Sequence, residues 1–248
     1  MAPPRKFLRS AFSSAAAVGI TGVLSPVVSA LSLIDERAPD STLHFWADSI
    51  LRASGVRTEV RGLENLPPGN FVLCCNHQSH FDALVLFRHV RRHMRYVAKA
   101  QLRKIPVFGW ALHRAGNIFV DRSGGEKDKE KLNDAAEAVR ERVSVVFFAE
   151  GTRSDDGILR PFKKGAAIMA IDAQVPLIPA AVAGTHRILE KGSIVVQSRP
   201  SALIIGEPIP TAGLTMDARE ALTQQAHDAV ARLLEQGNAL VAQMEKEG

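Results

Sequence analysis

The chain has 248 residues and a mass of 26.9 kDa; 46% of its residues are hydrophobic and 23% are charged, with a formal net charge of +5. This balance is typical of a globular protein with one large or two small domains, and it excludes a disordered chain, a collagen-like repeat and a coiled-coil rod. The two cysteines, Cys74 and Cys75, are adjacent in an apolar run, which excludes a disulfide-stapled scaffold and predicts small buried residues in a reducing compartment.

The N-terminal segment 10–34 contains no charged residue and follows Arg5, Lys6 and Arg9. Its 25 residues are enough to span a bilayer, which needs ~20 apolar residues, although seven of them are Ser or Thr. Three interpretations stay open: a signal peptide, a membrane anchor with its positive start on the cytoplasmic side, and a buried core helix.

Residues 40–54 are predicted to form the next helix, with one apolar face at helical spacing and Ser41 as its N-cap. This helix either pairs with the N-terminal segment on a membrane or packs in a core. We expect two parts in the chain, an N-terminal membrane-anchoring helical segment at 1–55 and an α/β domain at 56–248.

From the turn at residues 66–69 onward, apolar runs of strand length alternate with helical patterns. Strands are predicted at 71–75, 95–98, 117–120, 144–149, 177–183, 194–197 and 202–205, and helices at 81–90, 107–114, 126–142, 165–172 and 216–243. This order predicts an α/β fold, a mostly parallel mixed sheet covered by helices on both faces. Ligands of such sheets bind beyond the carboxyl ends of the strands, where the polar clusters of this sequence follow the apolar runs.

Positive charge is concentrated at residues 88–104, which contain seven Lys or Arg and no Asp or Glu. Such a stretch suits the phosphates of lipid head groups, of a phosphorylated substrate or of nucleic acid, and is otherwise a solvated helix face. Aromatic residues make up only 6%, and no RNA-stacking or zinc-finger motif is present, so we expect no nucleic-acid partner.

The first polar cluster runs from Asn76 to Asp82, directly after a predicted strand. Asp82 can accept a hydrogen bond from one nitrogen of His77, which leaves the other nitrogen free to take a proton from a substrate hydroxyl. Two alternatives are a metal site that includes His80, although the spacing matches no standard site, and a purely structural role in which Asp82 caps the helix.

Two further clusters offer arginines to a phosphate, which their guanidinium groups bind bidentately. Arg122 follows the predicted strand 117–120, and Arg153 follows strand 144–149 in the run Glu150-Gly151-Thr152-Arg153. Gly151 permits a tight turn, and Glu150 can orient Arg153 or bind a substrate hydroxyl. The alternative for Arg122 is a turn in which it pairs with Asp121, and the alternative for Arg153 is a solvated turn that closes a strand.

The fourth cluster is Val175-Pro176-Leu177-Ile178-Pro179. Two prolines stiffen the start of a strand around Leu177 and Ile178. An apolar pair beside the site can hold a lipid chain, and plain core packing is the alternative.

Taken together, residues 56–185 resemble the lysophosphatidic acid acyltransferases, the 1-acylglycerol-3-phosphate O-acyltransferases of phospholipid synthesis. The four clusters are similar to the family blocks N-H-x-S-x-x-D, G-x-I-F-[IV]-D-R, F-P-E-G-T-R-S and V-P-[IV]-[IV]-P, in that order. Ala149 stands where the third block usually has proline. The stretch from Val97 to Trp110 also looks like the family.

The resemblance implies the fold above and the transfer of an acyl chain from acyl-CoA or acyl-carrier protein to the sn-2 hydroxyl of lysophosphatidic acid. It implies no metal and no other cofactor, a phospholipid membrane as partner, and a catalytic domain on the cytoplasmic face, since the acyl donors are cytoplasmic. Alternatives are another lysolipid acceptor and a non-catalytic lipid-binding protein. The implied site residues are His77 and Asp82 for catalysis, Arg122, Arg153 and Lys99 for phosphate, Asn76, Ser79, Glu150, Gly151 and Thr152 for positioning, and Leu177 and Ile178 for the acyl chain.

Overall fold

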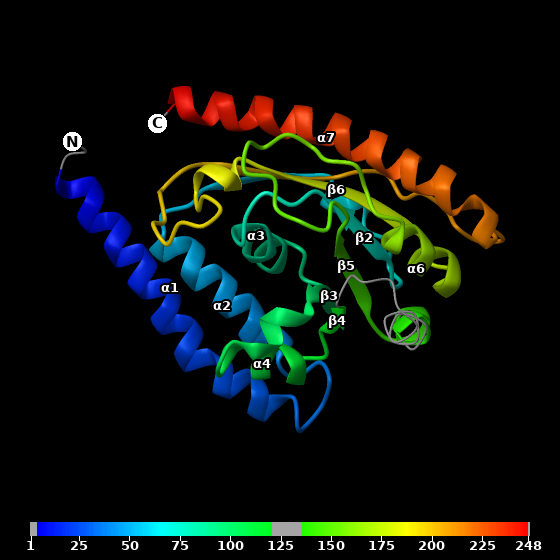
Figure 1. The fold of residues 1–248 in the computed structure, drawn as a ribbon, viewed down its shortest axis with the longest axis horizontal. Helices are drawn as coiled ribbons and strands as arrows, with labels where there is room; N and C mark the ends of the chain where they lie inside the picture. Colours follow the sequence, from blue (N-terminus) through cyan, green and yellow to red (C-terminus); the bar gives the residue numbers. More distant parts are fainter. Residues whose placement is uncertain (1–3, 121–134, 248) are drawn as a thin grey trace.

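The structure is a computed structural model that describes residues 4–120 and 135–247 (Figure 1). The helices are α1 (Pro4–Leu31), α2 (Asp40–Ala53), α3 (Phe81–His89), α4 (Phe108–Arg114), α6 (Gly165–Ala173) and α7 (Arg219–Glu247), and residues 135–141 are also helical. Short 3-10 turns are η1 (Leu63–Asn65), η2 (Ala100–Lys104), η3 (Thr185–Arg187) and η4 (Met216–Ala218). The strands are β1 (Thr58–Arg61), β2 (Val72–Cys75), β3 (Met94–Lys99), β4 (Ile118–Val120), β5 (Ser144–Phe148), β6 (Leu177–Ala183) and β7 (Ser201–Ile205).

The strands form one sheet in the order β1-β7-β6-β2-β5-β3-β4. The neighbours from β6 to β4 pair in parallel, and β6 pairs with β7 antiparallel. Because β2, β5, β3 and β4 run in the same direction, their carboxyl ends meet at one edge of the sheet. The predicted α/β fold, a mostly parallel mixed sheet, is confirmed.

Helices cover the sheet on both faces, as Figure 1 shows. Alternate residues of β2 point to opposite faces: Leu73 and Cys75 pack in the core cluster with α2 and α3, and Val72 and Cys74 pack in the cluster with α6. Helix α7 lies across β6 and β7. Both free cysteines are buried, as predicted, and burial raises the pKa of Cys74 to about 12.

The structure corrects three expectations about local structure. Residues 194–197 do not form a strand. The following strand, β7, is already paired on its two sides with β1 and β6. The 194–197 segment lies against α1 instead, where Ser14 Oγ donates to the carbonyl of Ile194. Ser41 does not cap α2; Pro39 occupies the cap position without a side-chain hydrogen bond. Strand β1 was not predicted, because this short edge strand alternates half-buried and exposed residues rather than apolar ones.

Helices α1 and α2 form an antiparallel hairpin on one face of the sheet. Ser13 Oγ donates to the carbonyl of Ala53 at 3.2 Å, and Trp46 Nε1 donates to Thr21 Oγ1 at 2.9 Å. The segment Arg9–Leu31 of α1 is long and apolar enough to cross a membrane by length and composition. Helix α4 packs beside α1, so α1 contacts protein along one side.

A charged cluster joins the start of α2 to β3. The buried Arg95 places its guanidinium 2.9 Å from Asp40 Oδ1 and donates to the carbonyl of Glu36, and His93 Nδ1 lies 2.6 Å from Asp40 Oδ2. Burial would raise the pKa of Asp40, but the hydrogen bonds from His93 and Arg95 outweigh it and lower that pKa. The cluster therefore clamps the helical hairpin to the sheet.

Candidate active site

His77 follows β2 at the carboxyl edge of the sheet and pairs with Asp82 in the first turn of α3. His77 Nδ1 lies 2.8 Å from Asp82 Oδ2, and because a carboxylate only accepts, Nδ1 carries the proton of this bond. The other ring nitrogen, Nε2, has no hydrogen-bond partner among the residues that the structure describes. The pair therefore has the form of a base whose tautomer is fixed by a carboxylate.

Asp82 is fully buried and has more partners than His77. Its Oδ2 also accepts the backbone N–H groups of Gln78 at 2.7 Å and Ser79 at 2.9 Å, and its Oδ1 accepts the hydroxyl of Thr185. These bonds fix the carboxylate in one orientation. Sequence reasoning missed Thr185, which lies 103 residues away in η3 and belongs to no recognised motif.

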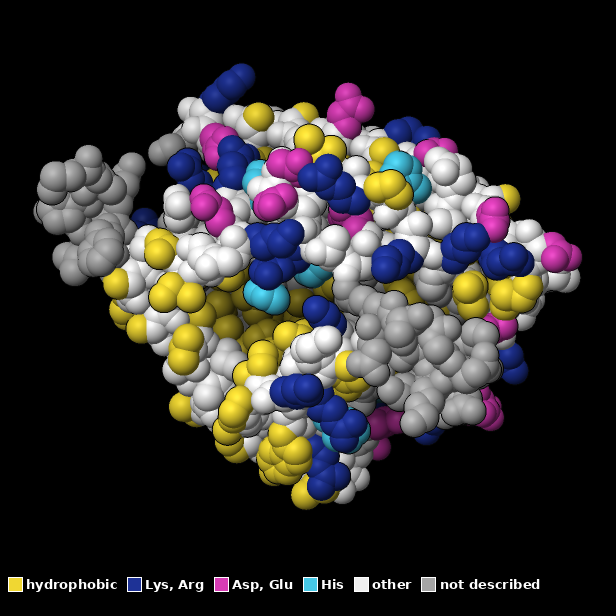
Figure 2. Space-filling view, viewed as in Figure 1, with side chains coloured by type: hydrophobic (Ala, Val, Ile, Leu, Met, Phe, Trp, Pro, Cys, Tyr) yellow, Lys and Arg dark blue, Asp and Glu magenta, His cyan; other side chains and the backbone are white. Residues whose placement is uncertain are grey.

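The imidazole of His77 stacks on the ring of Phe148 at the end of β5. The ring centroids are 4.1 Å apart and the planes differ by 15°. Only 15% of the His77 side chain is exposed, so one face of the base is packed and one edge is open. On the face of the molecule that Figure 2 presents, a hollow with hydrophobic walls lies near the middle, and histidine and Lys or Arg side chains lie on its rim.

Glu150 joins the two loops that follow β2 and β5. Its Oε1 accepts the backbone N–H of His77 at 2.6 Å, and its Oε2 accepts the backbone N–H of Arg160 at 2.9 Å. Ser154 N–H donates in turn to the carbonyl of His77 at 2.8 Å. Burial raises the pKa of Glu150 to about 7, although the two backbone hydrogen bonds oppose this shift. The carboxylate thus holds the backbone of the His77 loop, and its predicted contact with substrate or with Arg153 stays a prediction.

The turn after β5 presents a basic side chain at the same edge. Gly151 adopts a positive φ of 74°, which favours glycine, and a Cβ there would lie 2.9 Å from the Lys163 side chain. Thr152 is exposed and Arg153 half-buried. Desolvation lowers the pKa of His80 to about 4, and the positive charge of Arg153 contributes to this shift.

Asn76 and Ser79, predicted to position substrate, are turned into the protein. The amide of Asn76 donates to the carbonyl of Val182 at 2.9 Å and accepts its N–H at 2.8 Å. Ser79 Oγ donates to the carbonyl of Leu189 at 2.9 Å. Both side chains are buried, so they hold the loop of His77 against β6 and the segment after η3.

Leu177 and Ile178 do not fit the predicted role of holding an acyl chain. Both are fully buried, Leu177 in the core cluster with α6 and Ile178 in the cluster with α2 and α3. They pair with Val72 and Leu73 at the start of β2, whereas His77 follows its end. Core packing, the alternative interpretation, is therefore the correct one.

In the basic stretch 88–104, some side chains bind other parts of the protein and others are exposed. Arg88 pairs with Asp48 at 3.2 Å, Arg95 belongs to the Asp40 clamp, and Arg92 donates to three carbonyls of the turn at residues 67–69. Lys99 is exposed at the carboxyl end of β3. Arg122, the other predicted phosphate ligand, lies outside the described residues, as does most of the helix predicted at 126–142.

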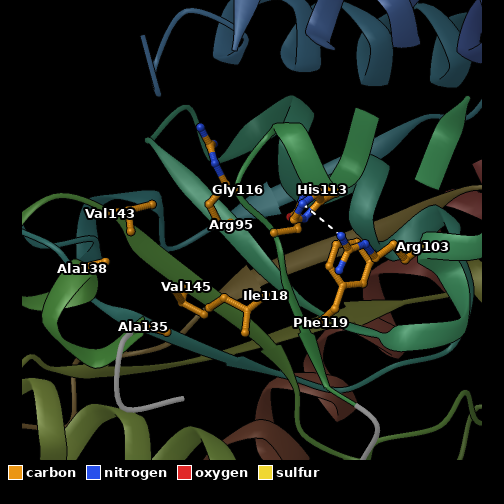
Figure 3. A pocket seen from close by; sticks show the side chains of 11 residues that line it. Arg95, Arg103, His113, Gly116, Ile118, Phe119, Ala135, Ala138, Val143 and Val145 are labelled. Carbon is orange, nitrogen blue, oxygen red and sulfur yellow. Dashed lines mark hydrogen bonds between the residues drawn. The ribbon is translucent and has the colours of Figure 1, made fainter. Parts of the chain in front are cut away.

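A cavity of about 370 Å³ lies beside β3 and β4 and is separate from His77. Figure 3 shows Arg95, Arg103, His113 and Phe119 around it, and Arg103 lies 3.3 Å from His113 Nε2. Of the predicted site residues that the structure describes, none lines this cavity. Among the residues that the structure describes, no group of three or more His, Cys, Asp or Glu is placed to hold a metal ion.

A family model described as Acyltransferase matches residues 57–183, about half of the chain and both loops around His77. The chain belongs to the acyltransferase family. It is 36% identical over 156 residues to a chloroplastic 1-acyl-sn-glycerol-3-phosphate acyltransferase of Brassica napus, which covers 62% of this chain and 45% of the relative. It is 33% identical over 173 residues to the human 1-acyl-sn-glycerol-3-phosphate acyltransferase alpha, which covers 69% of this chain and 61% of the relative.

The acyltransferase also resembles a solved structure over nearly its whole length. The crystal structure of the 1-acyl-sn-glycerophosphate acyltransferase PlsC from Thermotoga maritima matches with a TM-score of 0.80 and 25% identity, over 94% of this chain and 95% of that one. The likeness extends over the N-terminal hairpin as well as the sheet. The chain spans about half the length of the curated Brassica relative.

Proposed function

We propose that this acyltransferase moves a fatty acyl chain from a thioester donor to the sn-2 hydroxyl of 1-acylglycerol-3-phosphate and so forms phosphatidic acid. The observation that carries the proposal is the His77–Asp82 pair, with Nδ1 held by the carboxylate and Nε2 open at the carboxyl edge of the sheet. The names of the Brassica, human and Thermotoga relatives support this acceptor.

In the proposed reaction, His77 Nε2 takes the proton of the sn-2 hydroxyl as its oxygen attacks the thioester carbonyl. The tetrahedral intermediate collapses with loss of the thiolate, and protonated His77 returns its proton to that sulfur. Asp82 holds the imidazole and stabilises its positive charge between the two steps. The donor is acyl-CoA or acyl-carrier protein, and no acyl-enzyme is needed.

Arg153, Lys99 and Arg122 are proposed to hold the acceptor phosphate. Arg153 follows β5, the neighbour of β2, and desolvation and its charge together lower the pKa of His80 beside His77. Lys99 is the last residue of β3, which lies two strands from β2. At ~4.8 Å between neighbouring strands, the backbones of β3 and β2 are about 10 Å apart. An arginine that binds the phosphate bidentately fixes where the neighbouring hydroxyl lies. Such positioning lowers the activation barrier, because the reactants are already oriented when the reaction begins.

We further propose that α1 lies in the surface of one leaflet, with the catalytic domain on the cytoplasmic side. Its outward residues include Val18 and Val23, which are 75% and 71% exposed. Its inner side packs on α2, where Asp48 pairs with Arg52 at 2.7 Å. A spanning α1 would draw that ion pair into hydrocarbon at a large cost, whereas a helix in the interface leaves it in water.

The proposed reaction is tested with membranes that contain the full chain, supplied with lysophosphatidate and labelled acyl-CoA or acyl-carrier protein. We expect labelled phosphatidate from the wild type and a loss of at least about 100-fold in His77→Ala. His227→Ala is the matched control, because His227 also neighbours an aspartate, Asp228 at 3.5 Å, but lies on α7. Equal product from wild type and His77→Ala overturns the mechanism, and product only with another lysolipid overturns the acceptor.

A further inference from the structure

The η2–α4 tip, residues 103–110, projects beside α1 and is largely apolar. Residues 103–107, Arg-Lys-Ile-Pro-Val in sequence, are all exposed. The side chains of Ile105 and Val107 are 43% and 49% exposed, and Trp110 is 53% exposed. Three large apolar side chains in the open on one short segment are typical of an interaction surface.

The fold holds this tip in a fixed shape. Val107 has a positive φ of 63°, which is strained for a β-branched residue and persists only where the surroundings impose it. Gly109 packs so tightly that a Cβ there would lie 2.4 Å from the carbonyl oxygen of Arg103. Ala111 and Ala115 pack in the core cluster that includes Val28 of α1, so Trp110 is left on the outer side.

The η2–α4 tip is positively charged. Residues 83–120 contain no Asp or Glu. The guanidinium of Arg114 lies 5.8 Å from the centre of the Trp110 ring. Desolvation, Arg103 and Arg114 together lower the pKa of His113, which agrees with a positive potential at this place. A surface of this charge attracts anionic groups.

The tip continues the apolar side of α1. Helix α4 contacts α1, and Figure 2 shows hydrophobic and Lys or Arg side chains together in the region that α4 occupies in Figure 1. Large exposed hydrophobic residues on the hairpin itself are Phe12, Val18, Val23, Val27, Leu33, Ile34 and Phe45. Tryptophan flanked by arginine and lysine is typical of segments at a membrane surface.

We propose that the η2–α4 tip is a second membrane contact, which inserts Ile105, Val107 and Trp110 into the surface of an anionic phospholipid bilayer while Arg103 and Lys104 bind its head-group phosphates. This inference rests on the proposed docking of α1 and adds a role to it. A single helix in the interface leaves the protein free to roll about the helix axis. A second contact beside that axis stops the roll and fixes the direction in which the edge of His77 faces the lipid.

Trp110 reports the insertion directly. The chain has two tryptophans, so Trp46→Phe leaves Trp110 as the sole one. Full-chain Trp46→Phe is mixed with vesicles of phosphatidylcholine containing a minority of phosphatidylglycerol. We expect the emission of Trp110 to shift to shorter wavelength, its quenching by acrylamide to fall several-fold, and brominated lipid to quench it.

Lys104→Glu tests the charge, and Arg232→Glu, an equal change at an exposed position on α7, is the matched control. We expect flotation with the anionic vesicles to weaken about tenfold in Lys104→Glu, since each basic residue near such a surface contributes on the order of 1 kcal/mol. Arg232→Glu is expected to float like the wild type.

Three outcomes overturn the proposal. Protein that floats with vesicles while Trp110 stays accessible to acrylamide refutes the second contact and leaves the docking of α1 intact. Protein that does not float refutes both contacts, and acyl transfer between dispersed short-chain substrates then reports the proposed reaction separately. A Trp110 shift produced by acyl-carrier protein and not by vesicles assigns the tip to a protein partner.

Discussion

The imidazole of His77 lies flat against the ring of Phe148, with centroids 4.1 Å apart, while its edge is held by Asp82 at 2.8 Å. The stack fixes the plane of the base and the hydrogen bond fixes its rotation within that plane. Phe148 ends β5, His77 follows β2 and Asp82 lies in the first turn of α3, so the pairing of β2 with β5 sets the position of the stack.

Phe148→Leu keeps an apolar side chain but removes the flat surface under His77. We expect kcat to fall about twofold to tenfold, the equivalent of the 0.5–1.5 kcal/mol that such ring pairs contribute, with little change in the KM of either substrate. Steady-state kinetics on dispersed short-chain substrates measures both constants. A change in KM alone would mean that Phe148 binds substrate rather than orients the base.

Thr185→Val removes the hydroxyl that donates to Asp82 and leaves the carboxylate with its other three partners. We expect kcat to fall about tenfold, since one hydrogen bond to a charged group contributes about 1.5–3 kcal/mol and part of the orientation survives. Thr185→Ser restores the hydroxyl and should recover most of the rate. Failure of serine to rescue would point to packing as the role of Thr185.

Glu150→Gln tests the buried carboxylate that holds the backbone of His77. Burial raises the pKa of Glu150 to about 7, so the folded protein keeps a proton that the unfolded chain releases near its ordinary pKa of 4.5. From pH 5 to 8 this group therefore lowers the stability of the wild type by about 1–3 kcal/mol, a slope that the glutamine variant lacks. Chemical denaturation of both proteins at several pH values measures the difference, and parallel curves would contradict it.

Asp40→Asn opens the clamp between α2 and β3 and leaves Arg95 buried without its carboxylate. We expect the free energy of unfolding to fall by about 3 kcal/mol at pH 7. The pKa of Asp40 is lowered, so its contribution is present above the ordinary value of 3.8 and is lost as the pH falls below it. Wild type and variant should therefore converge in stability as the pH falls well below 3.8, a sign opposite to that at Glu150.

Val23→Asp places a charge on the outward side of α1, where the valine is 71% exposed. We expect vesicle binding to weaken at least about tenfold, because a charge replaces an apolar side chain in the interface. Leu63→Asp is the control, since Leu63 is an exposed leucine on η1, outside the hairpin and the η2–α4 tip. Equal weakening in both variants would show that overall charge, rather than docking of α1, controls binding.

Strand and helix order followed from the sequence because apolar runs and helical spacing are local signals. The same signals missed β1, because its sequence Thr-Glu-Val-Arg is as polar as an exposed edge strand allows. They also assigned a strand to residues 194–197, where Ile194 and Val195 are apolar but lie exposed beside α1. Local pattern reports that a segment is apolar, whereas its partner decides whether it becomes a strand.

The candidate pair His77 and Asp82 was predictable because both residues lie in one short loop. The direction in which the neighbouring side chains point was not predictable, because it depends on contacts across the sheet. Asn76 bonds to β6, and Glu150 bonds to the backbone N–H of His77. The motif thus predicts which residues gather at the site, and the structure shows which of them bond to the loop that carries His77.

The placement of α1 along the domain has a consequence for the membrane as a whole. In the proposed docking, α1 is packed on one side by α2 and α4 and reaches the lipid of one leaflet only. In the proposed reaction, the acceptor then enters and the product leaves on the same side, so each turnover adds an acyl chain to a single leaflet. A bilayer that grows on this enzyme becomes asymmetric in area unless a separate transbilayer step moves phospholipid to the other side.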